Sequence, residues 1–398
     1  MIVLVANLGS TSFKCKLIQM QGGQHQELAA ASADRIGLGQ SHWRVGAADR
    51  QATGVDDLPD HAAAIQLHLD QLVRIEAIDE LARIDAIGFK AVHGGAISGA
   101  VAIDAKVLAT MEQFNDVAPQ HNPPYIAAMK ALKRQLPHVP QVAAFETAFH
   151  QTIPMARQVY GVPYEWVSRL GIRRYGFHGA SHRYIANRMA EVAPEADRLI
   201  SCHLGGSCSV CAIRGGRSQA NSFGMTTQTG VFHASRAGDF DTFALLKLLE
   251  SGLKLPQIWQ TLGTESGLAG LSGISSDLRQ VQEAAQGGNR QAQLSLDAFV
   301  ESVRHYLGAY LAVLNGADAL IFTGGIGQHA AAIRAAICDR MDYAGITLDR
   351  QRNDRVKGDQ ETRIDSADSR VAVWVMPTNE ELIVARQTVE VLAGPTQN

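Results

Sequence analysis

The stretch IVLVANLGSTSFKCKLIQM, Ile2 to Met20, decides the fold. Its first five residues form a short apolar run that is typical of a buried strand, and residues 13–20 are typical of a strand that returns beside it. Between them, Asn7 to Ser12 form a turn rich in Gly and Ser. The same frame recurs far along the chain as RLISCHLGGSCSVCAI, Arg198 to Ile213. Two such strand, turn and strand units indicate an internal duplication.

Helical patterns alternate with these strands. Apolar residues recur at helical spacing within 59–78 and 296–314, and residues 380–392 are typical of an amphipathic helix. Residues 319–322 (ALIF) predict a further buried strand, followed by the turn TGGIG and a helix over 328–341. Strands that alternate with helices predict the α/β class.

Composition excludes several classes of protein. The 398 residues, 46% of them apolar and 19% charged, are ordinary for a globular protein of two or three domains. The net charge of −3 gives no basic surface for a nucleic acid. We find no apolar run of the roughly 18 residues that cross a bilayer, and no leader pattern at the start. Five Cys in a chain of this length form no disulfide framework, so we expect a reduced, cytoplasmic setting, with Cys208 and Cys211 as buried strand residues rather than zinc ligands.

The three Gly-rich turns are candidates for binding phosphate. Phosphate oxygens need several backbone N–H donors at close range, and side chains on the turn would block that approach. For a single such turn, a plain hairpin is the more common explanation. Three turns, two of them in a repeated frame, make phosphate binding as good an explanation as plain hairpins.

Charged and imidazole groups stand near other turns. Lys90 precedes the sequence VHGG, Arg236 lies in SRAGD, and His178 and His182 surround a Gly turn. The two His residues would chelate a metal only if they were helical neighbours, and they lack the HExxH glutamate. Glu146, among apolar neighbours, is either a cap at a helix start or a functional carboxylate. Together, cations and a carboxylate around phosphate turns are what phosphoryl transfer requires.

Segments along the whole chain resemble those of a known family. The segments VANLGSTSFKCKL, KAVHGGAISG, APQHNPP, FETAFHQTIP, RRYGFHGASHRY, CHLGGSCSV, SRAGDFD, SGISSDLR, FTGGIG and PTNEEL occur in the order seen in acetate kinases. The resemblance implies an ATP-dependent kinase of short-chain carboxylic acids, acetate first, that uses Mg²⁺ (or Mn²⁺) and forms a homodimer. It also implies a duplicated RNase H-like (actin-like ATPase) fold with the active site in the cleft between two domains, residues 1–148 plus 383–398 and residues 149–382.

The resemblance assigns roles residue by residue. Asn7 and Glu380 match the metal ligands. The catalytic residues are Glu146, His178 and Arg236. The substrate-binding residues are Lys90, Val92, Gln120, Phe177 and Thr227. The ATP-binding residues are Lys14, His203, Leu204, Gly205, Gly206, Ser207, Asp277, Leu278, Arg279, Gly325, Ile326, Gly327, Gln328 and His329.

Several of these positions depart from the family pattern. Glu146 stands where the family has Asp, and Lys90 stands where it has an Arg that grips the carboxylate, so the charge is kept while the bidentate geometry is lost. A non-catalytic nucleotide-binding protein is the alternative, but decay would not be expected to preserve the sign of each charge. A sugar kinase is a further alternative, yet a neutral hydroxyl substrate needs no cluster of Lys90, His178 and Arg236.

The acyl pocket yields the first prediction. Gln120 and Thr227 stand where the family has apolar residues, and buried polar groups without partners cost about 1–3 kcal/mol each. We therefore expect kcat/KM for glycolate or lactate to match or exceed that for acetate or propionate, and a Gln120→Leu, Thr227→Pro double variant to restore acetate preference. If the wild type prefers acetate and the double variant leaves that ranking unchanged, the two side chains turn away from the pocket or hold a water, and acetate is the substrate.

Overall fold

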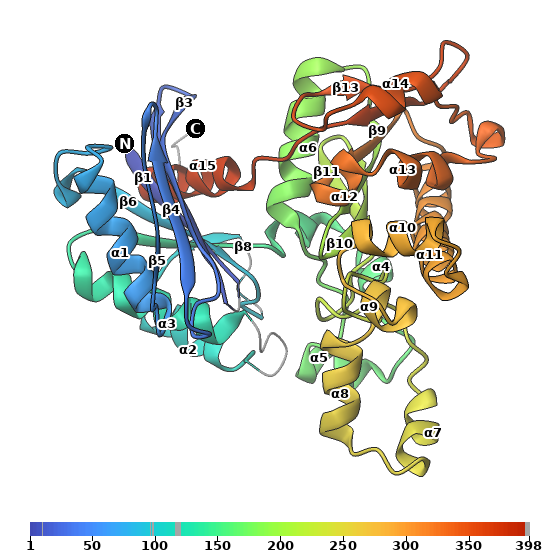
Figure 1. Cartoon of the computed structure of the whole chain (residues 1–398), viewed down its shortest axis with the longest axis horizontal. Coiled ribbons are helices and arrows are strands. Elements are labelled where there is room, and N and C mark those ends of the chain that lie inside the picture. The colour runs from blue at the N-terminus through green and yellow to red at the C-terminus, as the bar shows by residue number, and fades with distance from the viewer. Residues whose placement is uncertain (10, 96, 98, 116–120, 395–398) are drawn as a thin grey trace. The chain divides into compact units, whose positions relative to one another are not determined.

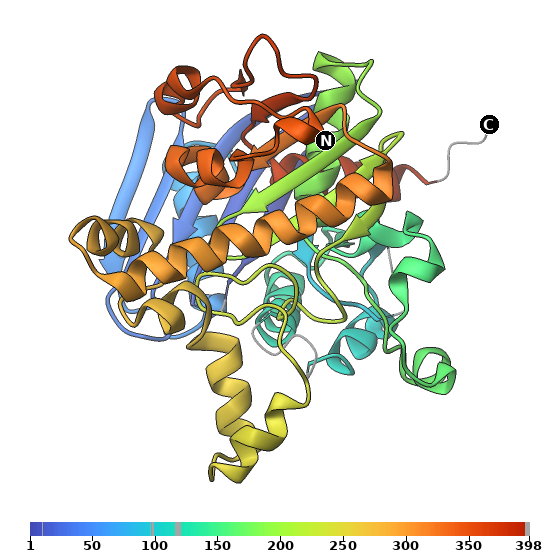
Figure 2. The ribbon, with the colours of Figure 1, turned by 90° about the vertical axis from the view of Figure 1, so that its right-hand side faces the viewer.

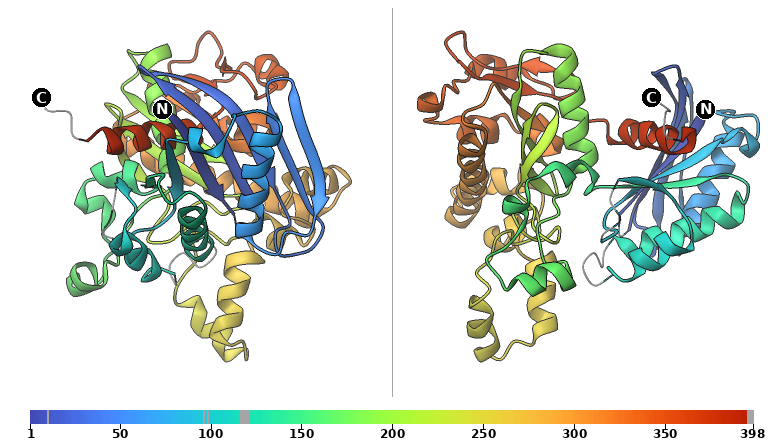
Figure 3. Two further views of the ribbon diagram at one scale, coloured as in Figure 1. Left: turned by 90° about the vertical axis from the view of Figure 1, so that its left-hand side faces the viewer. Right: turned by 180° about the vertical axis from the view of Figure 1, so that it is seen from behind.

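The chain divides into two compact units in the computed structural model, which describes residues 1–9, 11–95, 97, 99–115 and 121–394. One unit is Met1–Ala148 with Asn379–Asn398, and the other is Phe149–Thr378 (Figure 1). The C-terminal segment thus joins the first unit from residue 379, where the sequence placed the boundary at 383. The reason is that helix α15, Glu380–Ala393, packs along its length on strands β1 and β6 (Figure 3).

The first unit is built on a sheet with the strand order β5-β4-β3-β2-β1-β6-β8-β7 among the described residues. Strand β1 is antiparallel to β2 and parallel to β6, which is in turn parallel to β8. The strands are β1 Ile2–Leu8, β2 Phe13–Gln21, β3 Gln24–Ala33, β4 Ser41–Ala47, β5 Arg50–Asp56, β6 Ala86–Ala91, β7 Ala100–Ala102 and β8 Gln141–Phe145. The helices are α1 His61–Arg74, η1 Leu81–Arg83, α2 Ala105–Glu112, α3 Asn122–Gln135 and α15.

The second unit is built on a sheet with the order β11-β10-β9-β12-β14-β13. Its strands are β9 Arg198–Leu204, β10 Cys208–Arg214, β11 Arg217–Asn221, β12 Ala319–Thr323, β13 Thr362–Arg363 and β14 Ala372–Val375. Its helices before β12 are η2 Ala148–Thr152, which starts at the boundary, α4 Met155–Gln158, α5 Tyr164–Leu170, α6 Gly179–Val192, α7 Ala244–Glu250, α8 Leu255–Thr264, α9 Gly267–Ser272, α10 Leu278–Gln286 and α11 Arg290–Leu314. After β12 come α12 Gly324–His329, α13 Ala331–Cys338, η3 Asp342–Ala344 and α14 Arg350–Arg355.

The two sheets share one topology. In each, three antiparallel strands are followed by two strands parallel to the first, as β3-β2-β1-β6-β8 in one unit and β11-β10-β9-β12-β14 in the other. The two Gly-rich frames of the sequence are the first hairpin of each copy, β1–β2 and β9–β10. The predicted duplicated α/β fold is therefore confirmed.

Two helix boundaries differ from the prediction. The helix expected over 328–341 is instead α12 and α13, because the backbone at Ala330 (φ −98°, ψ 78°) leaves the helical region between them. Helix α11 starts before residue 296 because the Asn289 side chain accepts hydrogen bonds from the N–H groups of Gln291 and Ala292 and caps it there.

Helices cover both faces of the second sheet. Figure 2 shows the long helix α11 crossing one face, where its Phe299, Val303 and Leu307 join Val210 and Phe322 in the larger core. Helix α6 packs on the other face with Ile185 and Met189. No helix among the described residues is both long and apolar enough to cross a membrane.

Candidate active site

Four predicted residues gather at one edge of the first sheet. Asn7 lies near the end of β1, Lys90 near the end of β6, Glu146 directly after β8, and Glu380 opens α15. Because β1, β6 and β8 are parallel, their carboxyl ends meet at the same edge, which is where ligands bind in sheets of this kind. The topology thus brings together residues that are far apart in sequence, such as Lys90 and Glu380, which are 290 positions apart.

The charged side chains of this cluster are mostly buried. Lys90 forms an ion pair with Glu380, and their side chains are only 17% and 11% exposed. Burial by itself lowers the pKa of Lys90, but the negative charges of Glu380 and Glu146 outweigh it and raise the pKa above its usual value. Lys90 is therefore a permanent cation beside two carboxylates.

An aromatic side chain that the sequence did not single out supports the Asn7 amide. The Tyr125 hydroxyl accepts a hydrogen bond from the Leu8 N–H at 2.9 Å and lies 3.4 Å from the Asn7 amide oxygen. The Asn7 amide nitrogen lies 3.4 Å from a carboxylate oxygen of Glu381. Tyr125 comes from helix α3, far away in sequence, so no local pattern announces it.

The donor set fits a hard divalent cation. An amide oxygen at Asn7 and carboxylates at Glu380 and Glu146 are the oxygen ligands that Mg²⁺ prefers. Mg²⁺ keeps several waters and takes one or two protein carboxylates, so it needs no dedicated cage. No group of three or more His, Cys, Asp or Glu suited to a metal occurs in the described part of the chain.

Glu146 is placed by the backbone between β8 and the short helix η2. Its N–H donates to the Ala91 carbonyl at 2.8 Å, which fixes the residue beside the end of β6. The residue is 4% exposed, and its charge acts on both Lys90 and Tyr125. Glu146 is thus a nearly buried carboxylate that lies close to other charged groups.

In the second unit, two of the predicted phosphate turns lie side by side. The parallel pairing of β9 with β12 sets His203 opposite Thr323, so the turn after β9 meets the start of α12. Gly324 has φ +76°, and a Cβ there would lie 2.6 Å from the Leu204 carbonyl oxygen, so only glycine allows this approach. Gly206 and Gly325 differ, because a Cβ at either would meet nothing within 4 Å. Their backbones face open space that a ligand can enter.

A cavity of about 470 Å³ opens beside these turns. It is lined by eight of the predicted ATP-binding residues, namely Gly205, Gly206, Asp277, Leu278, Arg279, Gly325, Ile326 and His329, together with Ala234, Ser276, Gln282 and Ala330. Asp277 accepts a hydrogen bond from the Arg279 N–H and caps α10, and it forms an ion pair with the Arg279 guanidinium at 2.5 Å. Asp277 and Arg279 therefore lie at the start of helix α10, beside the Gly-rich turns.

The other predicted ATP residues stand outside this lining. Leu204 and Gly327 are buried behind the turns, His203, Ser207 and Gln328 are half-buried near them, and Lys14 is exposed on β2 of the first unit.

A buried arginine that the sequence did not reveal holds the third turn in place. Arg334 has no exposed surface, and its guanidinium donates to the carbonyls of Gly327 at 2.9 Å and Gln328 at 2.8 Å. It also donates to the Asn353 side-chain oxygen at 2.8 Å. Its partners are mainly carbonyl groups, which leave no charge pattern in a sequence.

The predicted catalytic residues of the second unit are His178 and Arg236. Arg236 is half-buried and donates to the Thr227 carbonyl at 2.5 Å. Burial lowers the pKa of Arg236 to about 10, so the guanidinium stays charged at neutral pH in a poorly hydrated place. His178 has φ +57° at the start of α6 and lies with its ring 4.2 Å from that of His203. An anion would relieve the cost of such a buried cation.

The two histidines of the Gly turn do not form a chelating pair. Nδ1 of His178 and Nε2 of His182 both contact the Ser209 hydroxyl, at 2.9 and 2.8 Å. Both nitrogens are thereby directed at a hydroxyl group rather than at a common metal position.

The predicted acyl-pocket residues are distributed over both units. Val92 is buried after β6 in the first unit. In the second, Phe177 is buried against Phe223 with ring centroids 5.5 Å apart, and Thr227 is half-buried. Gln120 lies outside the described residues.

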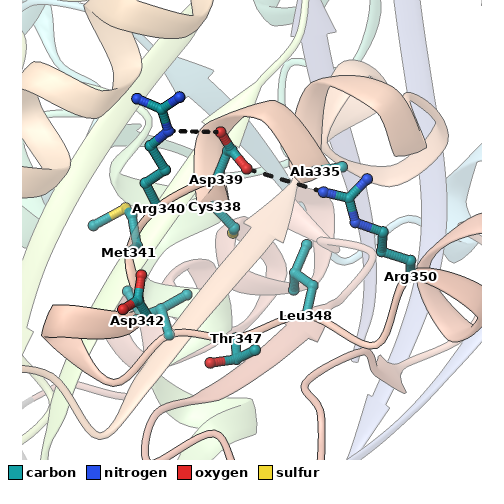
Figure 4. A pocket seen from close by; sticks show the side chains of 10 residues that line it. Ala335, Cys338, Asp339, Arg340, Met341, Asp342, Thr347, Leu348 and Arg350 are labelled. Carbon is teal, nitrogen blue, oxygen red and sulfur yellow. Dashed lines mark ion pairs between the residues drawn. The ribbon is translucent and has the colours of Figure 1, made fainter.

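A smaller hollow of about 150 Å³ lies at the end of α13 (Figure 4). Asp339 stands there between Arg340 and Arg350, at 3.8 and 3.9 Å. None of the predicted site residues lines it.

Comparison with known proteins identifies the family. The model of the acetokinase family matches residues 2–386. The chain belongs to the acetokinase family. It is 40% identical to an acetate kinase of Shouchella clausii, over 97% of this chain and 98% of that protein. It is also 40% identical to a propionate kinase of Escherichia fergusonii, over 98% of this chain and 96% of that protein.

Solved structures agree with this assignment. The crystal structure of Porphyromonas gingivalis acetate kinase matches with a TM-score of 0.88 and 36% identity, covering 98% of this chain and 99% of that one. A propionate kinase from Francisella tularensis matches with a TM-score of 0.90 and 33% identity, over the same shares of the two chains.

The open space at Gly206 and Gly325 makes the phosphate site testable. Gly206→Ala and Gly325→Ala should each weaken ATP binding at least about tenfold, because a methyl group would occupy the space of a phosphate while folding is undisturbed. Isothermal titration calorimetry and a melting curve measure the two effects. Gly308→Ala, at a helical glycine that also has nothing within 4 Å of an added Cβ, is the control. Wild-type affinity in both turn variants would remove these glycines from the phosphate site.

Proposed function

We propose that this member of the acetokinase family transfers the γ-phosphoryl group of ATP to the carboxylate of a short-chain acid, acetate or propionate, giving an acyl phosphate and ADP. The observation that carries the proposal is the cavity in which two Gly turns face the start of helix α10. Relatives named acetate kinase and propionate kinase, matched over nearly the whole chain, support the choice of acceptor.

The proposed reaction is a single displacement. A carboxylate oxygen of the acid attacks the γ-phosphorus, and the bond to the oxygen that bridges the β- and γ-phosphates breaks, with its electron pair leaving on ADP. Negative charge spreads over the transferring oxygens, so positioned cations and hydrogen-bond donors do most of the catalytic work. We assign this work to Arg236 and His178.

Asn7, Glu380 and Glu146 would hold the Mg²⁺ ion, partly through water, and the ion would neutralise phosphate charge. Lys90 forms an ion pair with Glu380. The positive charge of Lys90 would attract the substrate carboxylate.

We also propose that the enzyme is a cytoplasmic homodimer. The five Cys residues are all free and buried, which suits a reducing compartment. The loop and helical hairpin at 240–259 expose a run of large apolar side chains, namely Phe240, Phe243, Leu246, Leu249, Leu253, Leu255 and Trp259. Exposed apolar surface of this kind marks protein interfaces.

Substitution of Phe243 and Trp259 by Asp should convert the dimer to a monomer, because these side chains are 80% and 56% exposed within that apolar surface. Light scattering coupled to gel filtration measures the mass. Tyr343→Asp, at a side chain 72% exposed elsewhere on the same unit, is the control and should stay dimeric. A monomeric wild type, or a dimeric double variant, contradicts the proposal.

Arg236→Ala should reduce kcat by about 10³- to 10⁵-fold, the range for an arginine that stabilises a transferring phosphoryl group. ATP affinity should change little, because the charge is used mainly when the equatorial oxygens gain negative charge. Steady-state kinetics with a separate ATP titration distinguish the two. A fall of less than tenfold in kcat at unchanged KM would exclude Arg236 from catalysis.

Glu146→Gln should nearly abolish turnover and leave the protein folded, because the amide keeps the shape and removes the charge beside Lys90. If Glu146 only caps a helix start, the variant should remain active and lose at most about 1 kcal/mol of stability. Turnover and melting temperature measured on the same preparation decide between the two roles.

A further inference from the structure

A chain of alternating serine and histidine side chains runs behind His178 in the second unit. Ser201 Oγ lies 2.9 Å from His182 Nδ1. The other nitrogen of that ring, Nε2, lies 2.8 Å from Ser209 Oγ. Ser209 Oγ lies in turn 2.9 Å from Nδ1 of His178. Each side chain contacts the next through a polar atom at hydrogen-bond distance.

The fold itself places these four side chains together. Strands β9 and β10 pair Ser201 with Cys211 and His203 with Ser209, so Ser201 and Ser209 lie on one face of the sheet. Helix α6 packs on that face. His178 and His182 are four positions apart at its start, which directs both rings to the same side. The alternation of side chains along the strands and the four-residue spacing along the helix thus bring the four side chains together.

The middle ring of the chain is neutral. His182 has no exposed surface. Burial, and then the neighbouring rings of His150 and His203, keep its pKa well below the usual value. A neutral imidazole carries one proton, so one of its nitrogens donates a hydrogen bond and the other accepts one.

Two proton arrangements satisfy the Ser209 hydroxyl, which has one hydrogen to donate. In the first, Ser201 donates to His182 Nδ1, His182 donates through Nε2 to Ser209, and Ser209 donates to Nδ1 of His178. In the second, every direction is reversed, so that Nδ1 of His178 donates to Ser209 and His182 donates to Ser201.

Ser201 decides between the two arrangements. In the first, its hydroxyl hydrogen is accepted by His182. In the second, that hydrogen needs another acceptor, and the hydroxyl has no further hydrogen-bond partner within the part of the chain that the structure describes. Ser201 is fully buried, so an unused donor there is costly. In the first arrangement the hydrogen directed out of the chain is the Nε2–H of half-buried His178, whereas in the second it is the hydroxyl hydrogen of fully buried Ser201, so the first arrangement is the more stable one.

We propose that the Ser201–His182–Ser209 chain fixes His178 as the neutral tautomer with its proton on Nε2, so that Nε2–H is a ready donor to the transferring phosphoryl group. Ser209, His182 and Ser201 are then positioning residues that act through His178, since the hydrogen bond at one ring nitrogen sets the state of the other. This inference rests on the proposed function of His178 as a catalytic residue.

The first test is spectroscopic and needs no substrate. Two-bond ¹⁵N–¹H spectra of the full chain labelled with ¹⁵N-histidine report which ring nitrogen carries the proton, and His178→Gln and His182→Gln variants assign the signals. We expect both rings to be protonated at Nε2 alone. A proton on Nδ1 of His178 at neutral pH, in either a neutral or a charged ring, overturns the proposal.

Variants at Ser201 and at Ser209 then test the hydrogen-bond chain. Ser201→Ala does not touch His178, yet it removes the feature that selects the arrangement, so a second tautomer of His178 should appear in the spectrum. Ser209→Ala should lower kcat at least about tenfold, with both KM values within about twofold, because ring placement is lost while substrate contacts remain.

The matched control is Ser218→Ala. Ser218 is a fully buried strand serine at 2.9 Å from Nδ1 of His150, so its loss removes the same kind of bond without touching the chain. It should leave the His178 spectrum unchanged and kcat within about twofold. An unchanged kcat in Ser209→Ala, or an equal loss in the control, overturns the positioning role.

The two hypotheses fail in different ways. A protein with the expected tautomers that forms no acyl phosphate would refute the proposed function alone. An active kinase with Nδ1–H at His178 would refute the hydrogen-bond chain alone.

Discussion

The parallel pairing of β9 with β12 is the constraint on which the proposed nucleotide site depends. It sets the turn after β9 against the start of α12 and brings the Gly324 Cα so close to the Leu204 carbonyl that no side chain fits between them. Beside this close contact, the backbones of Gly206 and Gly325 face the cavity. Arg334 donates hydrogen bonds to the carbonyls of Gly327 and Gln328 at the end of α12, which keeps this segment in one conformation. A site for phosphate is built mainly from backbone, and strand register fixes the backbone.

Charge is the second organising feature. Lys90 and Glu380 neutralise one another in a nearly buried pair, while Arg236 keeps a cation whose pKa burial has lowered. Burying an ion without full compensation costs free energy, and a bound anion or metal repays that cost. Such groups therefore favour the charged ligands of phosphoryl transfer, because little reorganisation is needed when charge develops. Lys90 and Glu146, which stand where the family resemblance implies Arg and Asp, keep this balance of charge.

The sequence predicted those features that depend on local patterns. The two repeated hairpins follow from apolar runs and glycines, and the structure has them. The third Gly-rich stretch, expected as a turn, instead opens helix α12. The split between α12 and α13 escaped notice because Ala330 is a good helix former, and only its backbone angles break the helix. Tyr125, Arg334 and Ser209 were also missed. Their partners are backbone groups or side chains of distant elements, so nothing in the neighbouring residues signals them. Roles in catalysis were assigned through family resemblance, and they remain predictions.

The most direct test of the central claim follows an oxygen atom from the acid to phosphate. The enzyme is incubated with ATP, Mg²⁺ and acetate carrying ¹⁸O at both carboxyl oxygens, in the presence of hydroxylamine, which cleaves an acyl phosphate at the carbonyl carbon. Transfer to the carboxylate predicts a hydroxamate together with inorganic phosphate that contains one ¹⁸O atom per molecule. Release of ADP with no hydroxamate for any short-chain acid, or phosphate without ¹⁸O, would contradict the account.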